Sequence, residues 1–516
     1  MKVLIRSSTL PRDYLLIRYL SNLSFKKSGY IRVSIKTKPM KNLAFILFAS
    51  ILISFSFSLK AQTNPNHRFS EELNDLKSYF HIPGLAAVIE KDGEVIFEAY
   101  RGLANVHDSI WVTEHTAFPI ASLTKIFSGV LLMKLVEEGK ISLQEPINTY
   151  LEKSSLSDSI SIEHILTHTS QGTPGQDFYY SFRFGALTPV IEKAYGKSFI
   201  EAISSVIFQP VQMNNSWFLA DSLEVSKNKP VFAHPYLFDD SVQPGPVEYG
   251  ISASAGLVST AIDLLKFSSA LDANSIISES SKQLLFSPLK ENSPYGHGIF
   301  NQKFDGHQLL WGYGQYDAYS SLFVKVPEKN ITLILLANNN LMSDPARLIY
   351  GDISSSLFAL SFLKNYVFDN HLTSRNNFQK KEFLARALAA SFMSRFDTSE
   401  WERSIELLDT TFTKYPEYLE YANLNLLHNL MFLKTVAFHK ELGAFTKFDD
   451  KIEAIGSKLL ENHPDNPYAN VYLGNFYDEK GDMEKARLHF QTIVDAENFS
   501  PFWYTSVAKA WLKNNP

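Results

Sequence analysis

Cysteine is absent from all 516 residues of the chain. Disulfide bonds, thiolate metal sites and cysteine nucleophiles are therefore excluded. The rest of the composition, with 45% hydrophobic and 20% charged residues, is that of an ordinary globular protein. A chain of this length is too long for a single hydrophobic core, so the sequence predicts two or three domains.

The first residues of the chain lack any clear hydrophobic periodicity. Residues 1–39 carry nine Lys or Arg and one acidic residue, and we interpret them as a non-native or mis-annotated extension before a start at Met40. An apolar run follows over 43–59 and ends at Lys60 and Ala61, with no cysteine that could carry a lipid. This pattern is typical of a signal peptide over 40–61, which predicts cleavage after Ala61 and export to the periplasm or the exterior. The alternative is an uncut run that anchors the protein in a membrane.

An excess of basic residues is also missing once this segment is removed. Residues 62–516 carry 38 Lys or Arg against 53 Asp or Glu, a formal net charge of −15. This balance argues against nucleic acid and against anionic membrane surfaces as partners.

Two pairs of β-type runs lie far apart in the chain. Residues 84–91 and 94–100 flank an Asp-Gly dipeptide, which is typical of tight hairpin turns. Residues 318–326 and 331–338 flank a second turn, and the last of these runs is almost wholly apolar, which predicts a central strand. The residues between the two pairs are mostly helical and loop-like. We therefore expect an α+β fold in which both ends of one domain form a single antiparallel sheet around a helical insertion.

Strand signals are absent from residue 374 to the end, where the pattern is helical throughout. Residues 470–490 resemble a tetratricopeptide repeat in the spacing of Leu473-Gly474, Tyr477, Gly481-Asp482, Ala486 and Phe490. We expect an all-α, tetratricopeptide-like domain over 366–516 that could bind a protein or peptide partner. The alternatives are an irregular helical bundle, and helices that only pack on the preceding domain.

The stretch 117–138 combines a loop with a helix start. Ser122 is expected in the first turn of a buried helix, with Lys125 on the same face. A lysine in a partly dry pocket can have its pKa lowered enough to take the serine proton, and the helix N-terminus favours the developing anion. Ser-x-x-Lys also occurs at Ser24 and Ser287, so the motif alone is weak and its context must single out Ser122.

The context is a resemblance that covers residues 70–340, about half the chain. These residues resemble the serine hydrolase family that contains class C β-lactamases, penicillin-recognising D-Ala-D-Ala carboxypeptidases and related esterases and peptidases. The segments that carry the resemblance occur in order and at ordinary spacings: 119–125, 139–143, 162–170, 180–181, 190–192, 196–199 and 254–260. The resemblance implies a β-lactamase/transpeptidase-like antiparallel sheet with a helical subdomain over 62–365. It also implies a small-molecule or peptide substrate and no cofactor.

The family uses three motifs, of which this chain keeps only part. Ser122 and Lys125 match the first motif. The second, Tyr-x-Asn, reads Tyr180-Ser181-Phe182, so the tyrosine is kept and the asparagine is lost. The third, Lys/His-x-Gly, reads Gly312-Tyr313-Gly314, so the cation is missing.

The resemblance implies that Ser122 attacks a carbonyl to form an acyl-enzyme while Lys125 and Tyr180 share the proton transfers. The oxyanion is expected to bind the backbone N–H groups of Ser122 and Gln315, because a backbone donor does not depend on the side chain. Phe182, Gly312, Tyr313 and Gly314 are then expected at the substrate site. In the relatives the lost residues hold a substrate carboxylate and amide, and Arg183, Lys303 and His307 are candidate replacements.

Histidines offer no metal site, because His234, His297 and His307 lack ligand spacing with nearby acids. His164 and His168 are interpreted as structural hydrogen-bonding residues. The leading hypothesis is a secreted serine hydrolase that cleaves an ester, amide or peptide bond. A catalytically degenerate relative that binds ligands through its pocket and helices is the alternative, and a purely structural repeat protein conflicts with the ordered motifs.

Overall fold

The computed structural model describes residues 64–154, 156–228, 231–368, 372–420, 423–496 and 498–515. The extension expected over 1–39 and the signal peptide expected over 40–61 lie outside these ranges. Within the ranges, no helix is both long enough and apolar enough to cross a membrane.

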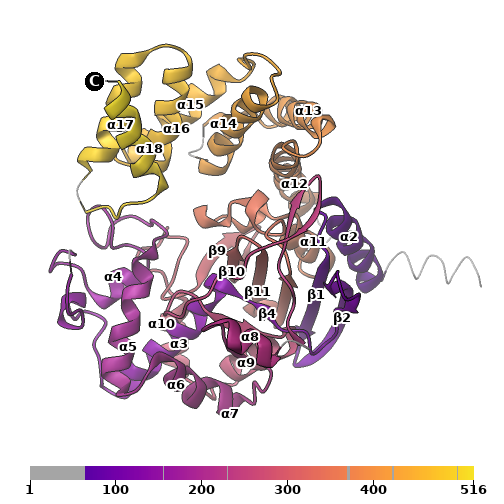
Figure 1. Cartoon of the computed structure of the whole chain (residues 1–516), viewed down its shortest axis with the longest axis vertical. Helices are drawn as coiled ribbons and strands as arrows, with labels where there is room; N and C mark the ends of the chain where they lie inside the picture. Colours follow the sequence, from indigo (N-terminus) through magenta and orange to yellow (C-terminus); the bar gives the residue numbers. More distant parts are fainter. Residues whose placement is uncertain are drawn as a thin grey trace, which may run out of the picture. The chain divides into compact units, whose positions relative to one another are not determined.

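A seven-stranded antiparallel sheet organises the first two thirds of the described chain (Figure 1). Its order is β3-β2-β1-β12-β11-β10-β9. The strands are β1 (Gly84–Lys91), β2 (Glu94–Asn105), β3 (Ile110–Trp111), β9 (Phe300–Phe304), β10 (His307–Tyr316), β11 (Tyr319–Val326) and β12 (Ile331–Ala337). The predicted pairs of runs are confirmed as the hairpins β1–β2 and β11–β12, and β1 pairs with β12 to join them.

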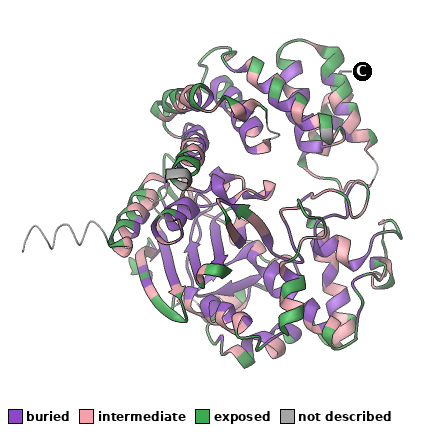
Figure 2. Cartoon of the chain, turned by 180° about the vertical axis from the view of Figure 1, so that it is seen from behind, coloured by how far each residue is buried: buried purple, intermediate pink, exposed green. Residues whose placement is uncertain are grey.

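The central position of β12 follows from its sequence. All seven of its residues are buried, because a strand covered on both faces needs an almost continuous apolar run. Successive side chains alternate between two cores on opposite faces of the sheet: Leu333 and Leu335 join one cluster, and Ile334 and Leu336 join the other. Figure 2 shows the buried strands between the helical layers.

One face of the sheet is covered by α2 (Pro65–Tyr79), α11 (Leu357–Tyr366) and α12 (Leu372–Met393). Helix α2 begins at Pro65, because Asn64 caps its N-terminus and a proline suits the first turn of a helix. Helix α11 begins after Ser356, whose side chain accepts a hydrogen bond from the backbone N–H of Ala359.

The opposite face packs on the helical insertion, which confirms the predicted helical subdomain. Its central helix α3 (Thr124–Glu137) is buried on nearly all sides, as expected for a core helix without a polar face. The insertion also contains α4 (Ile162–Leu166), α5 (Leu187–Tyr195), α6 (Phe199–Ile203), α7 (Gln209–Val211), α8 (Ser222–Asn228), α9 (Ala261–Asp272) and α10 (Glu279–Phe286). Two small β-structures complete it: a sheet β4-β8-β5 (Phe118–Pro119, Leu257–Ser259, Trp217–Phe218) and a hairpin of β6 (Tyr236–Asp239) and β7 (Ser241–Pro244).

The C-terminal region is helical, as predicted, and has a core of its own. After α12 it contains α13 (Thr398–Lys414), α14 (Leu424–His439), α15 (Asp449–Asn462), α16 (Pro467–Glu479), α17 (Met483–Asp495) and α18 (Trp503–Asn514). Gly474 lets α16 and α17 approach closely, because a Cβ there would lie 2.7 Å from the Phe490 ring. The likeness to a tetratricopeptide repeat stays a prediction.

The expected boundary between 365 and 366 does not separate two independent cores. Helix α12 contributes Phe378 and Phe392 to the cluster under the sheet, while Tyr179 of the insertion belongs to the core of the C-terminal helices. The helical region is therefore packed into the preceding domain.

Candidate active site

Ser122 lies in a short 3₁₀ turn over Ala121–Leu123 that leads directly into α3. Ala121 has a positive φ of 46°, a left-handed conformation that costs roughly 1–2 kcal/mol for a residue with a Cβ. Two contacts hold this turn in place: the Ile120 N–H donates to the Leu257 carbonyl at 2.9 Å, and the Ser321 hydroxyl donates to the Ile120 carbonyl at 2.8 Å. The strained turn leaves the serine partly exposed at the base of a pocket.

Lys125 is buried one helical turn beyond the serine. Its Nζ lies 2.9 Å from Ser122 Oγ and donates to the Ser254 carbonyl at 3.1 Å. Burial lowers the pKa of Lys125 from 10.5 to about 7, since among the described residues it forms no ion pair that would favour the charged form. A large share of this lysine is therefore an uncharged amine near neutral pH, in position to accept the serine proton.

Tyr180 closes the other side of the serine. Burial raises the pKa of its phenol above the usual value of 10, and a hydrogen bond from the Ser122 hydroxyl offsets part of the rise. The ring stacks on His168 at 4.4 Å between centroids, and Lys125 Nζ lies 5.0 Å from its centre. Tyr180 therefore stays neutral at physiological pH, which suits a proton donor and relay better than a base.

The two histidines of the insertion make the structural hydrogen bonds that the sequence suggested. His164 Nδ1 accepts the Ser161 N–H and completes the cap of α4. His168 Nδ1 accepts the Ser181 N–H at 3.1 Å, which holds the segment that carries Tyr180. Burial and the nearby Lys125 lower the pKa of His168 well below 6.5, so its ring is neutral.

Gln315 lies near the end of β10, beside the two-residue turn that joins it to β11. Tyr316 and Tyr319 close this hairpin, so the next pair, Gln315 and Ser320, is the one that does not exchange hydrogen bonds. On its other side β10 pairs with β9 only through His307–Trp311. The Gln315 N–H therefore faces the open edge of the sheet beside the pocket, as an oxyanion donor must.

The remaining substrate-site residues divide into two groups. Tyr313 and Phe182 line the pocket, and Phe182 is 75% exposed at its mouth. Gly312 and Gly314 are instead packed against the turn that carries Ser122. A Cβ at Gly314 would lie 1.8 Å from the Ile120 carbonyl oxygen, and a Cβ at Gly312 would lie 2.7 Å from Ile126 Cδ1. Neither glycine lines the pocket, contrary to the expectation for Gly312 and Gly314, and Tyr313 is the residue of this motif that does.

The C-terminal helices supply one wall of this pocket of about 370 Å³, through Ser500, Pro501, Phe502 and Tyr504. The segment is held by Arg183, which donates to the Ser500 hydroxyl at 2.6 Å and to the Asn498 carbonyl at 2.8 Å. Asn498 in turn donates to the Gly172 carbonyl at 2.8 Å. No local pattern in the sequence indicates this wall, because its residues follow Ser122 by more than 370 positions.

The charges around the pocket also differ from those expected. Arg183 is used in holding residues 498–500, while His307 contacts Glu328 on the far end of β10 and Lys303 lies on β9. Apart from Lys125, the cation that lines the pocket among the described residues is Arg347, which sequence reasoning missed. Glu248 and Asp317 line another part of the wall and make it acidic.

Comparison with known proteins places this site in a family. The family model described as "Beta-lactamase" matches residues 74–352, more than half of the chain. The chain is 24% identical over 309 residues to "Protein flp" of Staphylococcus aureus, an alignment that covers 50% of this chain and 60% of that protein. The chain thus spans only part of the length of this curated relative.

A solved structure shows the same fold. The octameric penicillin-binding protein homologue from Pyrococcus abyssi superposes with a TM-score of 0.53 and 25% identity, covering 62% of this chain and 80% of that one. A penicillin-binding protein from Bacillus halodurans superposes with a TM-score of 0.47 and 24% identity over 52% of this chain and 94% of that one.

Proposed function

The chain belongs to the β-lactamase family, and on that premise we propose that it is an exported serine hydrolase that cleaves an ester, amide or peptide bond through an acyl-enzyme on Ser122. The observation that carries the proposal is the 2.9 Å contact between Ser122 Oγ and a buried lysine whose pKa lies near 7. A nucleophile and a base matched to neutral pH are what this chemistry requires.

The first half of the reaction forms the acyl-enzyme. Ser122 Oγ attacks the substrate carbonyl carbon as its proton moves to Lys125 Nζ. The N–H groups of Ser122 and Gln315 hold the developing oxyanion, a contribution of several kcal/mol when such donors are preorganised. The bond to the leaving group then breaks, and the leaving atom takes a proton from the Tyr180 hydroxyl, which recovers one from protonated Lys125.

The second half returns the enzyme to its starting state. A water molecule enters opposite the acyl carbon and attacks it, giving its proton to Lys125 directly or through Tyr180. Collapse of the tetrahedral intermediate breaks the bond to Ser122 Oγ, which regains its proton, and releases the acid. Every proton taken in one half is returned in the other, so the cycle needs no cofactor.

The walls of the pocket favour uncharged or cationic substrates over carboxylates. The third motif supplies no cation to the pocket and Phe182 replaces the asparagine of the second motif, while Glu248 and Asp317 repel a carboxylate. Arg347 already donates hydrogen bonds from its Nε to His428 and from its Nη1 to Asp344. Since burying an unpaired carboxylate costs several kcal/mol, uncharged acyl esters are the preferred class and β-lactams the weaker one.

A second candidate is a catalytically degenerate relative that acts as a binding protein. The observation in its favour is the loss of the cation and the asparagine of two family motifs, which leaves Tyr313 and Phe182 as their residues in the pocket. Such a protein keeps its pocket and its helical wall but does not form an acyl-enzyme.

Labelling with a fluorophosphonate separates the two candidates. The hydrolase is expected to carry the adduct on the Ser122 peptide, as identified by mass spectrometry, and Ser122→Ala should abolish it. Ser287→Ala is the matched control, because Ser287 also lies in a Ser-x-x-Lys sequence but sits at the exposed end of α10. A folded wild-type protein that resists the probe at all pH values between 6 and 9 would support the binding protein.

A further inference from the structure

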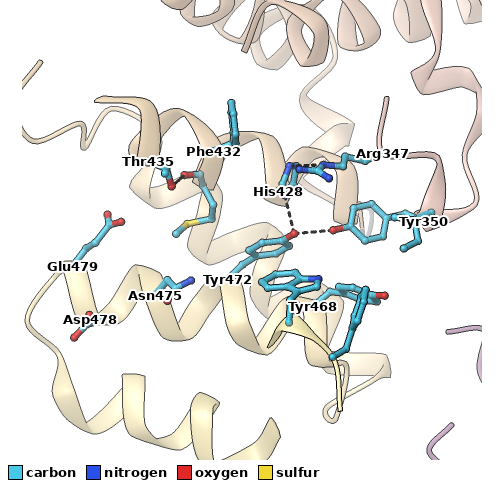
Figure 3. A pocket seen from close by; sticks show the side chains of 14 residues that line it. Arg347, Tyr350, His428, Phe432, Thr435, Tyr468, Tyr472, Asn475, Asp478 and Glu479 are labelled. Atoms are coloured by element: carbon cyan, nitrogen blue, oxygen red, sulfur yellow. Dashed lines mark hydrogen bonds between the residues drawn. The ribbon is translucent and has the colours of Figure 1, made fainter. Parts of the chain in front are cut away.

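A second cavity of about 600 Å³ lies next to the active-site pocket, on the C-terminal helices (Figure 3). Arg347, Ile349 and Phe502 line both cavities. The two cavities therefore lie side by side, with these three side chains in the wall between them.

The walls of the second cavity are largely aromatic: Tyr350, Phe432, Tyr468, Tyr472, Phe502 and Trp503. Trp503 is 40% exposed, and its ring centroid lies 6.1 Å from that of Tyr472 and 6.5 Å from that of Tyr468. Aromatic faces bind apolar chains by contact and attract cations through the negative potential of the ring.

At the end of the cavity nearest the active site, the polar side chains form hydrogen bonds with one another. Arg347 Nε donates to His428 Nε2 at 2.9 Å, so the other ring nitrogen carries the proton and donates to the Tyr472 hydroxyl at 2.7 Å. The hydroxyls of Tyr472 and Tyr350 lie 2.7 Å apart. Burial and Arg347 lower the pKa of His428 well below 6.5. The series of hydrogen bonds drawn with dashed lines in Figure 3 therefore has a neutral imidazole at its centre.

The opposite end is acidic. Figure 3 shows Asp478 and Glu479 at the end of the cavity away from Arg347. Both lie in the last turn of α16, where the helix dipole adds further negative potential. Glu479 shares Lys434 with Asp449, at 3.5 and 2.8 Å, while the Asp478 carboxylate has no ion pair or hydrogen bond from another described side chain. This end therefore keeps a net negative charge.

We propose that the second cavity is a subsite for the amine-bearing end of a peptide-like substrate whose scissile carbonyl lies at Ser122, an inference that rests on the proposed hydrolase function. The uncharged chain crosses Phe502 and lies along the aromatic wall, and its ammonium group faces Asp478 and Glu479. The acidic groups of the first pocket, Glu248 and Asp317, favour the same class of substrate, since they too repel carboxylates.

Matched ester substrates test this assignment by steady-state kinetics at pH 8. Oligoalanine 4-nitrophenyl esters of one to five residues are capped with a 6-aminohexanoyl or a hexanoyl group, which differ only in the ammonium. A second series carries the same capped chains on the phenol leaving group. One of the two series should show a preference once its chain is long enough to reach the acidic end. In that series kcat/KM should be about two- to fivefold higher for the ammonium form than for the hexanoyl form, which is the contribution of an exposed ion pair.

Charge variants of the C-terminal helices test whether the preference for the ammonium form comes from the cavity. Asp478→Asn should remove most of it and leave kcat/KM for the shortest hexanoyl ester unchanged. Glu484→Gln is the control, because it removes an equal charge from an exposed position of α17 that does not line the cavity. The inference is overturned if neither series shows a preference, or if the preference survives in the double variant Asp478→Asn/Glu479→Gln.

If the proposed hydrolase function is wrong, the experiments give a different result. In that case no ester is turned over and Ser122 is not labelled, yet titration calorimetry with 6-aminohexanoyl-pentaalanine amide still tests the cavity. Binding that is stronger than that of the hexanoyl analogue, and that weakens in Asp478→Asn, supports the subsite without catalysis. Equal binding of both analogues overturns it.

Discussion

The low pKa of Lys125 leads us to expect that the rate of acylation depends strongly on pH. The lysine is buried without an ion pair among the described residues, and its pKa is lowered to about 7. The base form then makes up about 9% of the protein at pH 6 and about 91% at pH 8. We therefore expect the acylation rate to rise about tenfold between these two pH values and to level off above pH 8. An ordinary lysine would still be mostly protonated at pH 9.

The second-order rate constant for fluorophosphonate labelling is the suitable measurement, because it reports acylation without the later hydrolysis step. The profile should have one rising limb with a midpoint near pH 7 and no falling limb below pH 9, since Tyr180 stays protonated there. Lys125→Arg, which keeps a positive charge that cannot be lost, should reduce the rate by about 100-fold or more. A flat profile, or a midpoint above pH 9 in the wild type, would refute the assignment of Lys125 as base.

The same pKa has a consequence for stability. Between pH 7 and 10.5 the unfolded chain binds a proton on this lysine that the folded protein does not bind, so its destabilising effect lessens as pH rises through this window. A shift from 10.5 to about 7 corresponds to roughly 5 kcal/mol. Lys125→Met should therefore raise the free energy of unfolding at pH 7, by at most about 5 kcal/mol, in urea titrations. A loss of stability in this variant would show that the buried amine is better solvated than its contacts indicate.

Further expectations concern the turn below the serine, the helical wall, substrate choice and export. Gly314→Ala should lose labelling and several kcal/mol of stability, because its Cβ would lie 1.8 Å from the Ile120 carbonyl oxygen; near-normal labelling would mean that this turn can move. Arg183→Ala should speed proteolysis near residue 500 and lower kcat/KM for long esters, whereas the exposed Arg386→Ala should do neither. Uncharged acyl esters should be hydrolysed with a higher kcat/KM than penicillins or cephalosporins, and efficient cephalosporin turnover would indicate that Arg347 binds the carboxylate. N-terminal sequencing of exported protein should begin near Gln62, and an intact apolar segment in the membrane fraction would indicate an anchor instead.

Local sequence determined most of the fold, because turns, strands and helices form through interactions between residues that are close together in the chain. The hairpin around Asp92 and Gly93 follows from turn chemistry, and the central place of β12 follows from its unbroken apolar run. The pairing of Ser122 with Lys125 follows from helical spacing, which puts residues three apart on one face.

Tertiary structure alone decided the properties that depend on contacts between distant segments. The pKa of Lys125 comes from burial by elements that lie far from it in the chain, and Arg347 reaches the pocket from a loop after β12. Phe502 forms a wall of the same pocket from the start of α18. A sequence pattern records which residues are apolar, charged or turn-forming, but not which surfaces meet. The sequence therefore predicted the contact between Ser122 and Lys125, while only the folded chain places an acidic, aromatic cavity of the C-terminal helices near them.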